Sequence, residues 1–190
     1  MHWTVTSCLR ASFPAALAIL LLDSAALAQG PHEHVATRAT GTPSASRFEL
    51  RFLEGMIDHH AMAVHMSELL HAQAIHAELR NLGDTIAVAQ SAEIKQMQAW
   101  LQQWYGHTHQ PPTMMASMRA LEQLKGEAFE KEFLQMMIRH HAMAVRQAKE
   151  CQRRAKHTEL HDMCHHIVQS QQREIVTMKD WLCRWYRKCT

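Results

Sequence analysis

The sequence predicts an all-α protein, a four-helix bundle made of two duplicated helical hairpins. One stretch occurs twice: 52–66, FLEGMIDHHAMAVHM, returns 81 residues later as 133–147, FLQMMIRHHAMAVRQ. The apolar residues around each copy recur at helical spacing, and no stretch has the alternation typical of strands. Each hairpin would have one apolar face to bury, so we expect the two hairpins to pack against each other.

The first residues predict a secretory signal peptide, 1–28. They have a weakly basic start, an apolar run too short to span a bilayer, and Ala26-Leu27-Ala28 before Gln29, which is typical of a cleavage site. An uncleaved anchor helix is the alternative. We therefore expect the protein in an oxidising compartment, a bacterial periplasm, with no membrane insertion after cleavage. The next stretch, 29–46, is rich in Gly, Pro, Ser, Thr and Ala, which predicts a disordered arm.

Four helices are expected in the remaining chain, which forms the bundle. Repeat 1 covers 47–105, with helices over 47–74 and 76–105. The stretch GHTHQPPT, 106–113, contains the strongest helix breakers and predicts the linker between the repeats. Repeat 2 covers 114–187, with helices over 113–154 and 158–187. The second helices also repeat, since Q-x-x-E-I-x-x-M-x-x-W-L begins at Gln90 and again at Gln171.

The composition indicates soft-metal chemistry. The chain holds 13 Met and 16 His but only 5 Phe and 2 Tyr, and its formal charge of +2 gives no reason to expect nucleic acid as a partner. Thioether and imidazole together favour Cu(I) and Ag(I) over hard cations. Methionine also fills gaps in ordinary cores, so packing alone is the competing interpretation.

The helical spacing gathers these ligand types on one face. At ~100° per residue, Met56, His59 and His60 share an arc, and His59 begins a second arc towards Met62 and Met66. In the second copy that arc is Met136, His140 and Met143. We expect two equivalent Cu(I) or Ag(I) sites, one on each copy. The candidate ligands are Met56, His59, His60, Met62, Met66, Met97, Met137, His140, His141, Met143 and Met178. The alternative is that the methionines are core residues and the histidines are hydrogen-bonded among them.

Two carboxylates are expected to point inward. Glu93 and Glu174 lie on the apolar stripes of the second helices. A buried carboxylate is costly unless it is paired, and the N–H of a metal-binding histidine is a suitable partner. A structural Glu–His pair without metal is the other interpretation.

Four of the five cysteines, Cys151, Cys164, Cys183 and Cys189, fall in the second half of the chain, and the fifth, Cys8, lies in the expected signal peptide. Cys151 and Cys164 flank the expected turn, and their counterparts are a large and a small residue, Leu70 and Gly83. We expect a disulfide between Cys151 and Cys164. Cys183 and Cys189 could close the C-terminus. Thiolate metal ligands are the alternative role for these cysteines.

With M-I-x-H-H-A-M-A and Q-x-x-E-I-x-x-M-x-x-W-L both present twice, the chain resembles the domain-of-unknown-function-305 family over about 47–187. The resemblance implies a ferritin-like fold and, from the CopM-type periplasmic copper-binding proteins in that family, copper or silver binding in metal resistance. It implies as ligands Met56, His59, His60 and Met97 with their counterparts Met137, His140, His141 and Met178. The four cysteines are not part of the family pattern.

We expect a non-enzymatic metal carrier that exchanges ions with other periplasmic copper-handling proteins. Three other functions are alternatives. A di-iron enzyme would use Glu49, Glu93, Glu130 and Glu174, but neither Glu93 nor Glu174 is followed by His at the third position. A haem bundle would need b-type haem, because no C-x-x-C-H motif occurs. A purely structural or partner-binding bundle would bind no metal.

Overall fold

The computed structural model describes residues 43–112 and 118–189, and all regular structure in these ranges is helical. The expected signal peptide and nearly all of the expected arm lie outside the described residues. None of the helices in the described ranges is long and apolar enough to cross a membrane. The elements are α1 (Pro43–Glu68), α2 (Leu70–Gln73), α3 (Ala77–Tyr105), α4 (Arg119–Glu122), α5 (Gly126–Arg154) and α6 (Thr158–Tyr186).

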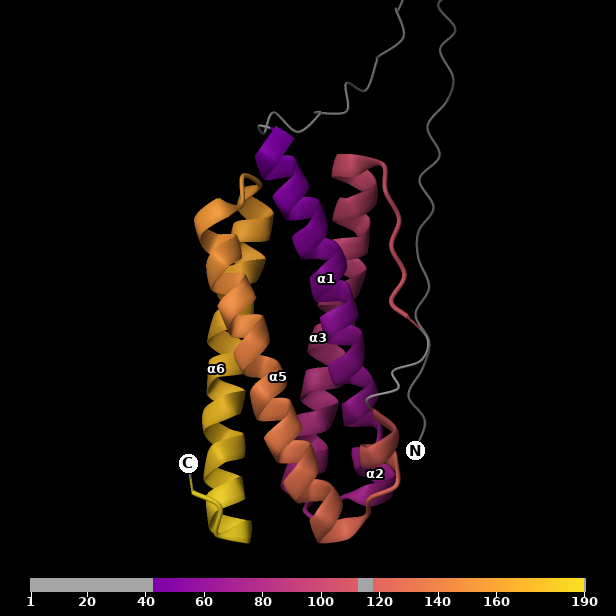
Figure 1. Cartoon of the computed structure of the whole chain (residues 1–190), viewed down its shortest axis with the longest axis vertical. Helices are drawn as coiled ribbons and strands as arrows, with labels where there is room; N and C mark the ends of the chain where they lie inside the picture. Colours follow the sequence, from indigo (N-terminus) through magenta and orange to yellow (C-terminus); the bar gives the residue numbers. More distant parts are fainter. Residues whose placement is uncertain (1–42, 113–117, 190) are drawn as a thin grey trace, which may run out of the picture. The chain divides into compact units, whose positions relative to one another are not determined.

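The four long helices form two hairpins, as predicted (Figure 1). α1 packs along α3, α5 packs along α6, and the hairpins meet mainly where α1 contacts α5. The repeat is visible in the bounds: α3 and α6 begin at Ala77 and Thr158 and end at Tyr105 and Tyr186, each pair 81 residues apart. The all-α four-helix bundle of duplicated hairpins is therefore confirmed.

The helix bounds differ from the prediction in three places. The third helix was expected from 113, but α5 begins only at Gly126, which has a φ of 58° after an extended Lys125. A helix cannot pass through this left-handed residue, and in the described part of the stretch between α3 and α5 the chain forms only the short α4. In the first hairpin the expected first helix is interrupted at Leu69, between α1 and α2. α1 also begins at Pro43, inside the expected arm, since proline is favoured in a first helical turn.

The apolar core consists of two clusters, one towards each end of the bundle. One cluster packs the first turns of α1 against the ends of α3 and α5 and the start of α6, and it includes Met56 and Met97. The other packs the end of α1 against the starts of α3 and α5 and the end of α6, and it includes Met137 and Met178. Buried polar residues, among them His60, His140, His141, Gln90 and Gln171, belong to neither cluster. The histidines of both motifs therefore lie in a polar layer between two apolar clusters.

The turns of the two hairpins are stabilised by different contacts, a disulfide in one and close packing in the other. The structure joins Cys151 to Cys164 in a disulfide with a Cα–Cα distance of 6.2 Å. At the equivalent place in the first hairpin, Leu70 Cδ1 lies 2.2 Å from where a Cβ on Gly83 would be. The large leucine thus fills the space that the missing side chain leaves, and no larger residue fits at position 83 unless Leu70 moves. A second disulfide, Cys183–Cys189, closes the C-terminal end.

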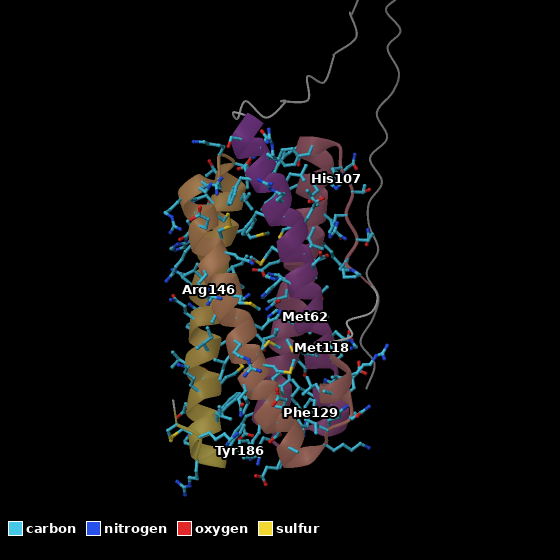
Figure 2. All side chains as sticks on the ribbon, viewed as in Figure 1. Met62, His107, Met118, Phe129, Arg146 and Tyr186 are labelled. Carbon is cyan, nitrogen blue, oxygen red and sulfur yellow. A yellow bond between two sulfur atoms is a disulfide. The ribbon has the colours of Figure 1, made fainter. Side chains whose placement is uncertain are left out.

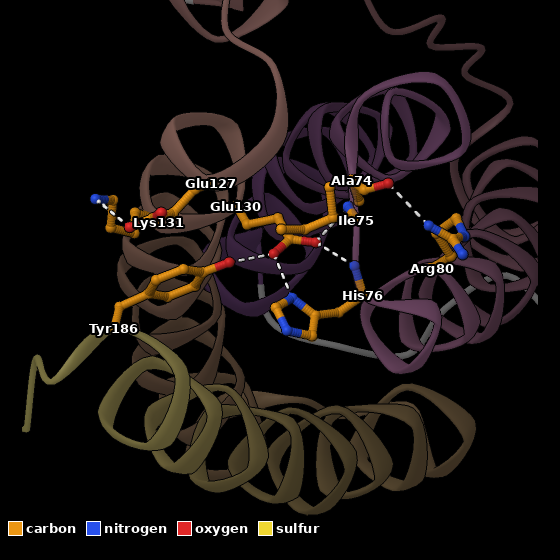
Figure 3. A network of polar contacts seen from close by, with 8 residues as sticks. All are labelled: Ala74, Ile75, His76, Arg80, Glu127, Glu130, Lys131 and Tyr186. Carbon is orange, nitrogen blue, oxygen red and sulfur yellow. Dashed lines mark hydrogen bonds and ion pairs between the residues drawn. The ribbon is translucent and has the colours of Figure 1, made fainter.

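Each hairpin also supplies a buried carboxylate to the turn of the other. Glu130, on α5, accepts hydrogen bonds from the Ile75 and His76 amides, both at 2.7 Å, from His76 Nδ1 at 2.6 Å, and from the Tyr186 hydroxyl (Figure 3). His76, the residue before α3, has no side-chain cap of its own. A carboxylate from the other hairpin therefore satisfies amides at this helix start, where the helix dipole favours negative charge.

The same arrangement recurs at the opposite end of the bundle. Glu49, on α1, accepts hydrogen bonds from the Lys156 and His157 amides, from His157 Nδ1 and from the Tyr105 hydroxyl. His157 also stacks on Trp104 with ring centroids 3.8 Å apart. The structure thus uses Glu49 and Glu130 to fasten one hairpin to the other, not to line the centre of the bundle.

One helix end carries strain that the repeat reveals. Gly106 ends α3 at φ 60°, and its counterpart Arg187 ends α6 at φ 56°, the only described residue other than glycine with a positive φ. A side chain in this conformation costs roughly 1 kcal/mol. We expect Arg187→Gly to raise the free energy of unfolding by about 0.5–1 kcal/mol, measured by urea denaturation. Lys188→Gly is the control and should give no gain. An Arg187→Gly protein no more stable than the original would contradict the expectation.

Candidate metal centre

The polar layer brings the histidines of the two motifs together. The sequence placed His59 and His140 on separate copies, but the structure brings their rings into contact where α1 meets α5, with centroids 3.5 Å apart and the ring planes tilted by 30°. All four nitrogens of these two rings are buried and have no hydrogen-bond partner. Buried polar atoms are almost always paired, so an unpaired set such as this requires an explanation.

The adjacent histidines are held by the carboxylates that the sequence had placed on the inner face. His60 Nε2 donates to Glu93 at 2.8 Å, and His141 Nε2 donates to Glu174 at 2.7 Å. A carboxylate accepts the proton that Nε2 carries, so the lone pair of each ring lies on Nδ1. Both Nδ1 atoms are buried and unpaired. The Glu–His contacts therefore favour the tautomer in which Nε2 carries the proton. In this tautomer the lone pair of Nδ1 lies inside the bundle and is available to a metal ion.

Burial keeps the facing pair uncharged. Burial, and next the nearby His60 and His141, lower the pKa of His59 to about 3. Burial, and next the nearby His59, lower the pKa of His140 to about 2. A neutral imidazole is the form that binds metal, so these rings need lose no proton to act as ligands near neutral pH.

Thioethers surround this layer on both sides. Met56, Met97, Met137 and Met178 are fully buried, one pair in each apolar cluster. The remaining sequence candidates lie on another side of the histidines. Met62, Met66 and Met143 line a pocket of about 280 Å³ together with Met136, Arg139 and His140. Figure 2 labels Met62 about midway along the bundle.

The donor set fits a soft, low-charge ion better than a hard one. Neutral imidazole and thioether donors suit Cu(I) and Ag(I), while iron or zinc would need more carboxylate or thiolate. In the ranges 43–112 and 118–189, no three His, Cys, Asp or Glu side chains group closely enough to hold a metal ion. The cysteines from 151 to 189 are paired in disulfides, which excludes them as thiolate ligands in this structure.

Three features of the site were missing from the sequence prediction. Met136 was placed on the second arc but not among the ligands, and Arg139 was not considered at all. The direct meeting of His59 with His140 was also missed, since the prediction treated each copy by itself. The identical offset of the two histidines was a usable signal, because a pseudo-twofold axis through the contact of α1 and α5 brings equivalent residues together.

Comparison with known proteins gives consistent matches. The family described as Domain of unknown function (DUF305) matches residues 49–182. CopM in the Cu(I)-bound form is 34% identical over 73% of this chain and 97% of CopM, with a TM-score of 0.68. CopM in an Ag-bound form is also 34% identical, with the same coverage and a TM-score of 0.66. A DUF305 fragment from Deinococcus radiodurans is 28% identical over 75% of this chain and 97% of the fragment, with a TM-score of 0.63. No curated protein matches the chain.

Proposed function

The chain belongs to the DUF305 family, and from this premise we propose that it is a periplasmic protein that binds Cu(I) or Ag(I) through its Met/His motifs. It would sequester these ions or hand them to other periplasmic copper-handling proteins, in copper or silver homeostasis or resistance. The similarity to CopM, solved with Cu(I), Ag and Cu(II) bound, supports a copper-related role. The periplasmic location rests on the N-terminal sequence.

One observation carries the proposal: the rings of His59 and His140 are in contact, and every ring nitrogen is buried and unpaired. A core built only for stability would gain by pairing these atoms or by replacing the rings with apolar side chains. Loss of buried hydrogen bonds is tolerated at functional sites, where a ligand supplies the missing partner. A metal ion that accepts the nitrogen lone pairs would be such a partner.

The other proposed ligands follow from the same layer. The Nδ1 atoms of His60 and His141 are free because Glu93 and Glu174 hold the opposite nitrogens. These carboxylates act on the ion through the histidines that they orient. Met56 and Met97 in one apolar cluster, and Met137 and Met178 in the other, supply thioethers from facing helices.

Binding is favoured over the di-iron alternative by the position of two carboxylates. Glu49 and Glu130 each accept four hydrogen bonds from the turns and tyrosines at the two ends of the bundle. A di-iron centre would need them beside Glu93 and Glu174. We therefore propose a carrier and not an enzyme.

A competition titration with a Cu(I) chelator tests this function. We expect the double variants His59→Ala/His60→Ala and His140→Ala/His141→Ala to bind fewer Cu(I) ions tightly than the original protein, since each loses two imidazoles. Zn(II) should bind more weakly, because thioethers contribute little to its binding.

The matched control is His165→Ala/His166→Ala, an adjacent histidine pair that is exposed on α6. It should leave tight Cu(I) binding unchanged. If both motif variants retain the original stoichiometry and affinity, the motif histidines are ordinary core residues and the proposed function is wrong.

A further inference from the structure

The thioether-lined pocket lies at the contact between the two hairpins, and it draws side chains from both. Met62 and Met66 come from α1, and Met136, His140 and Met143 come from α5. Arg139 completes the lining. A site that belonged to one copy would use the helices of one hairpin, whereas this pocket uses α1 of the first hairpin and α5 of the second, so it joins the two copies.

At the equivalent place in the other half, the described residues form a groove of a different kind. The counterpart of Met66 is Gln147, and the counterpart of Met136 is Gly55. These two residues line a different groove, of about 320 Å³, whose other lining residues are Phe48, Arg51, Phe52 and Glu150. That groove contains no thioether. The motif M-x-x-H-H-x-M is identical in the two copies, but the residues next to it differ. Met66 and Met136 supply thioethers that Gln147 and Gly55 lack.

The pocket extends from the surface to the buried His140. Met143 is 42% exposed, whereas Met66 is 1% exposed and His140 is 4% exposed. Both nitrogens of His140 are unpaired although the ring is buried. An ion that met the Met143 thioether at the surface would find further thioethers and then a free imidazole deeper in the same pocket.

Charge at the pocket favours monovalent ions. The thioethers and the His140 imidazole supply no negative charge, and Arg139, the charged residue of the lining, is 64% exposed and pairs with Glu132 at 3.6 Å. A divalent ion loses more hydration than a monovalent ion and finds no anionic ligand in the lining to compensate for that loss. At the equivalent position the first copy has Asp58, which is paired with His109 at 2.7 Å.

We propose that this pocket is a single soft-metal site, formed by Met62, Met66, Met136 and Met143 with His140 at its inner end, and that it fills before any other site. The inference rests on the proposed function, and it replaces two equivalent sites with one preferred point of entry. A monovalent soft ion, Cu(I) or Ag(I), is its ligand.

The test follows the methionine methyl groups of the full chain by NMR, with Ag(I) added as silver nitrate below one equivalent. We expect the methyl signals of Met62, Met66, Met136 and Met143 to shift first.

The variant Met66→Leu/Met136→Leu keeps the side-chain volume but removes two thioethers. We expect it to lower the affinity for the first Ag(I) ion by about tenfold or more. Met163→Leu, a partly buried methionine outside the pocket whose counterpart is already Leu82, should change neither result.

The outcomes separate the two proposals. If the methyls of Met56, Met97, Met137 and Met178 shift first and together, the sites are equivalent and the pocket inference is overturned, while the proposed function stands. Tight Ag(I) binding that Met66→Leu/Met136→Leu leaves intact would also overturn the inference. If neither Ag(I) nor Cu(I) binds to the original protein, both proposals fail. Circular dichroism of each variant establishes that it is folded.

Discussion

Replacing Glu130 by alanine is expected to lower the free energy of unfolding by about 3–5 kcal/mol, because it removes the acceptor of four hydrogen bonds from a fully buried position. The Ile75 and His76 amides at the start of α3 would lose their partner. Burial alone would raise the pKa of Glu130, but the Tyr186 hydroxyl and the His76 amide hold it below its usual value. The carboxylate is therefore charged and well compensated in the folded state.

Urea denaturation followed by circular dichroism measures this effect. Glu127→Ala is the matched control, since Glu127 lies one turn earlier on α5 and makes only an exposed ion pair with Lys131 (Figure 3). It should cost no more than about 0.5 kcal/mol. Glu49→Ala should behave like Glu130→Ala, because Glu49 has the same set of partners in the other half. A cost for Glu130→Ala as small as that of Glu127→Ala would show that the contact is dispensable.

The second large effect expected is a loss of stability of the metal-free protein as the pH falls from about 6.5 to about 4.5. Burial, followed by the neighbouring histidines, lowers the pKa of His59 to about 3 and of His140 to about 2, from 6.5. Below pH 6.5 the unfolded chain binds protons on these rings that the folded chain does not. The free energy of unfolding therefore falls on acidification, by at most about 1.4 kcal/mol per pH unit for each histidine.

The interval above pH 4.5 isolates these histidines from the buried carboxylates. The pKa values of Glu49 and Glu130 lie below their usual 4.5, since hydrogen bonds outweigh the effect of burial. Their stabilising contribution is complete above pH 4.5 and is lost only as the pH falls further. Between pH 6.5 and 4.5 these carboxylates therefore add little to the pH dependence, whereas below pH 4.5 both groups lower the stability.

Urea denaturation at several pH values compares the original protein with His59→Leu/His140→Leu. The variant lacks both titrating rings, so its stability should depend less on pH between 6.5 and 4.5. The exposed pair His165→Ala/His166→Ala should keep the original slope. The explanation fails if the leucine variant loses stability as steeply as the original protein.

The sequence by itself determined the helices, their pairing into two hairpins and the residue types at the centre. Local periodicity is sufficient for this, because a helix that buries one face must repeat apolar residues along that face. The 81-residue repeat then indicated that the hairpins are alike, and Leu70 opposite Gly83 and Cys151 opposite Cys164 were found where the repeat placed them. The start of α5 was predicted wrongly, because a helical pattern of side chains does not reveal the left-handed backbone at Gly126.

Only the tertiary structure decided which side chains meet across the two hairpins. Periodicity assigns His59 and His140 to an inner face, but their direct contact depends on where α1 crosses α5. The crossing also gathers Met66 and Met136 into one pocket and leaves Gln147 and Gly55 in another. Likewise, Glu49 and Glu130 reach turns that are distant in sequence. These contacts join residues of different helices, and the spacing along one helix contains no information on its partner's position.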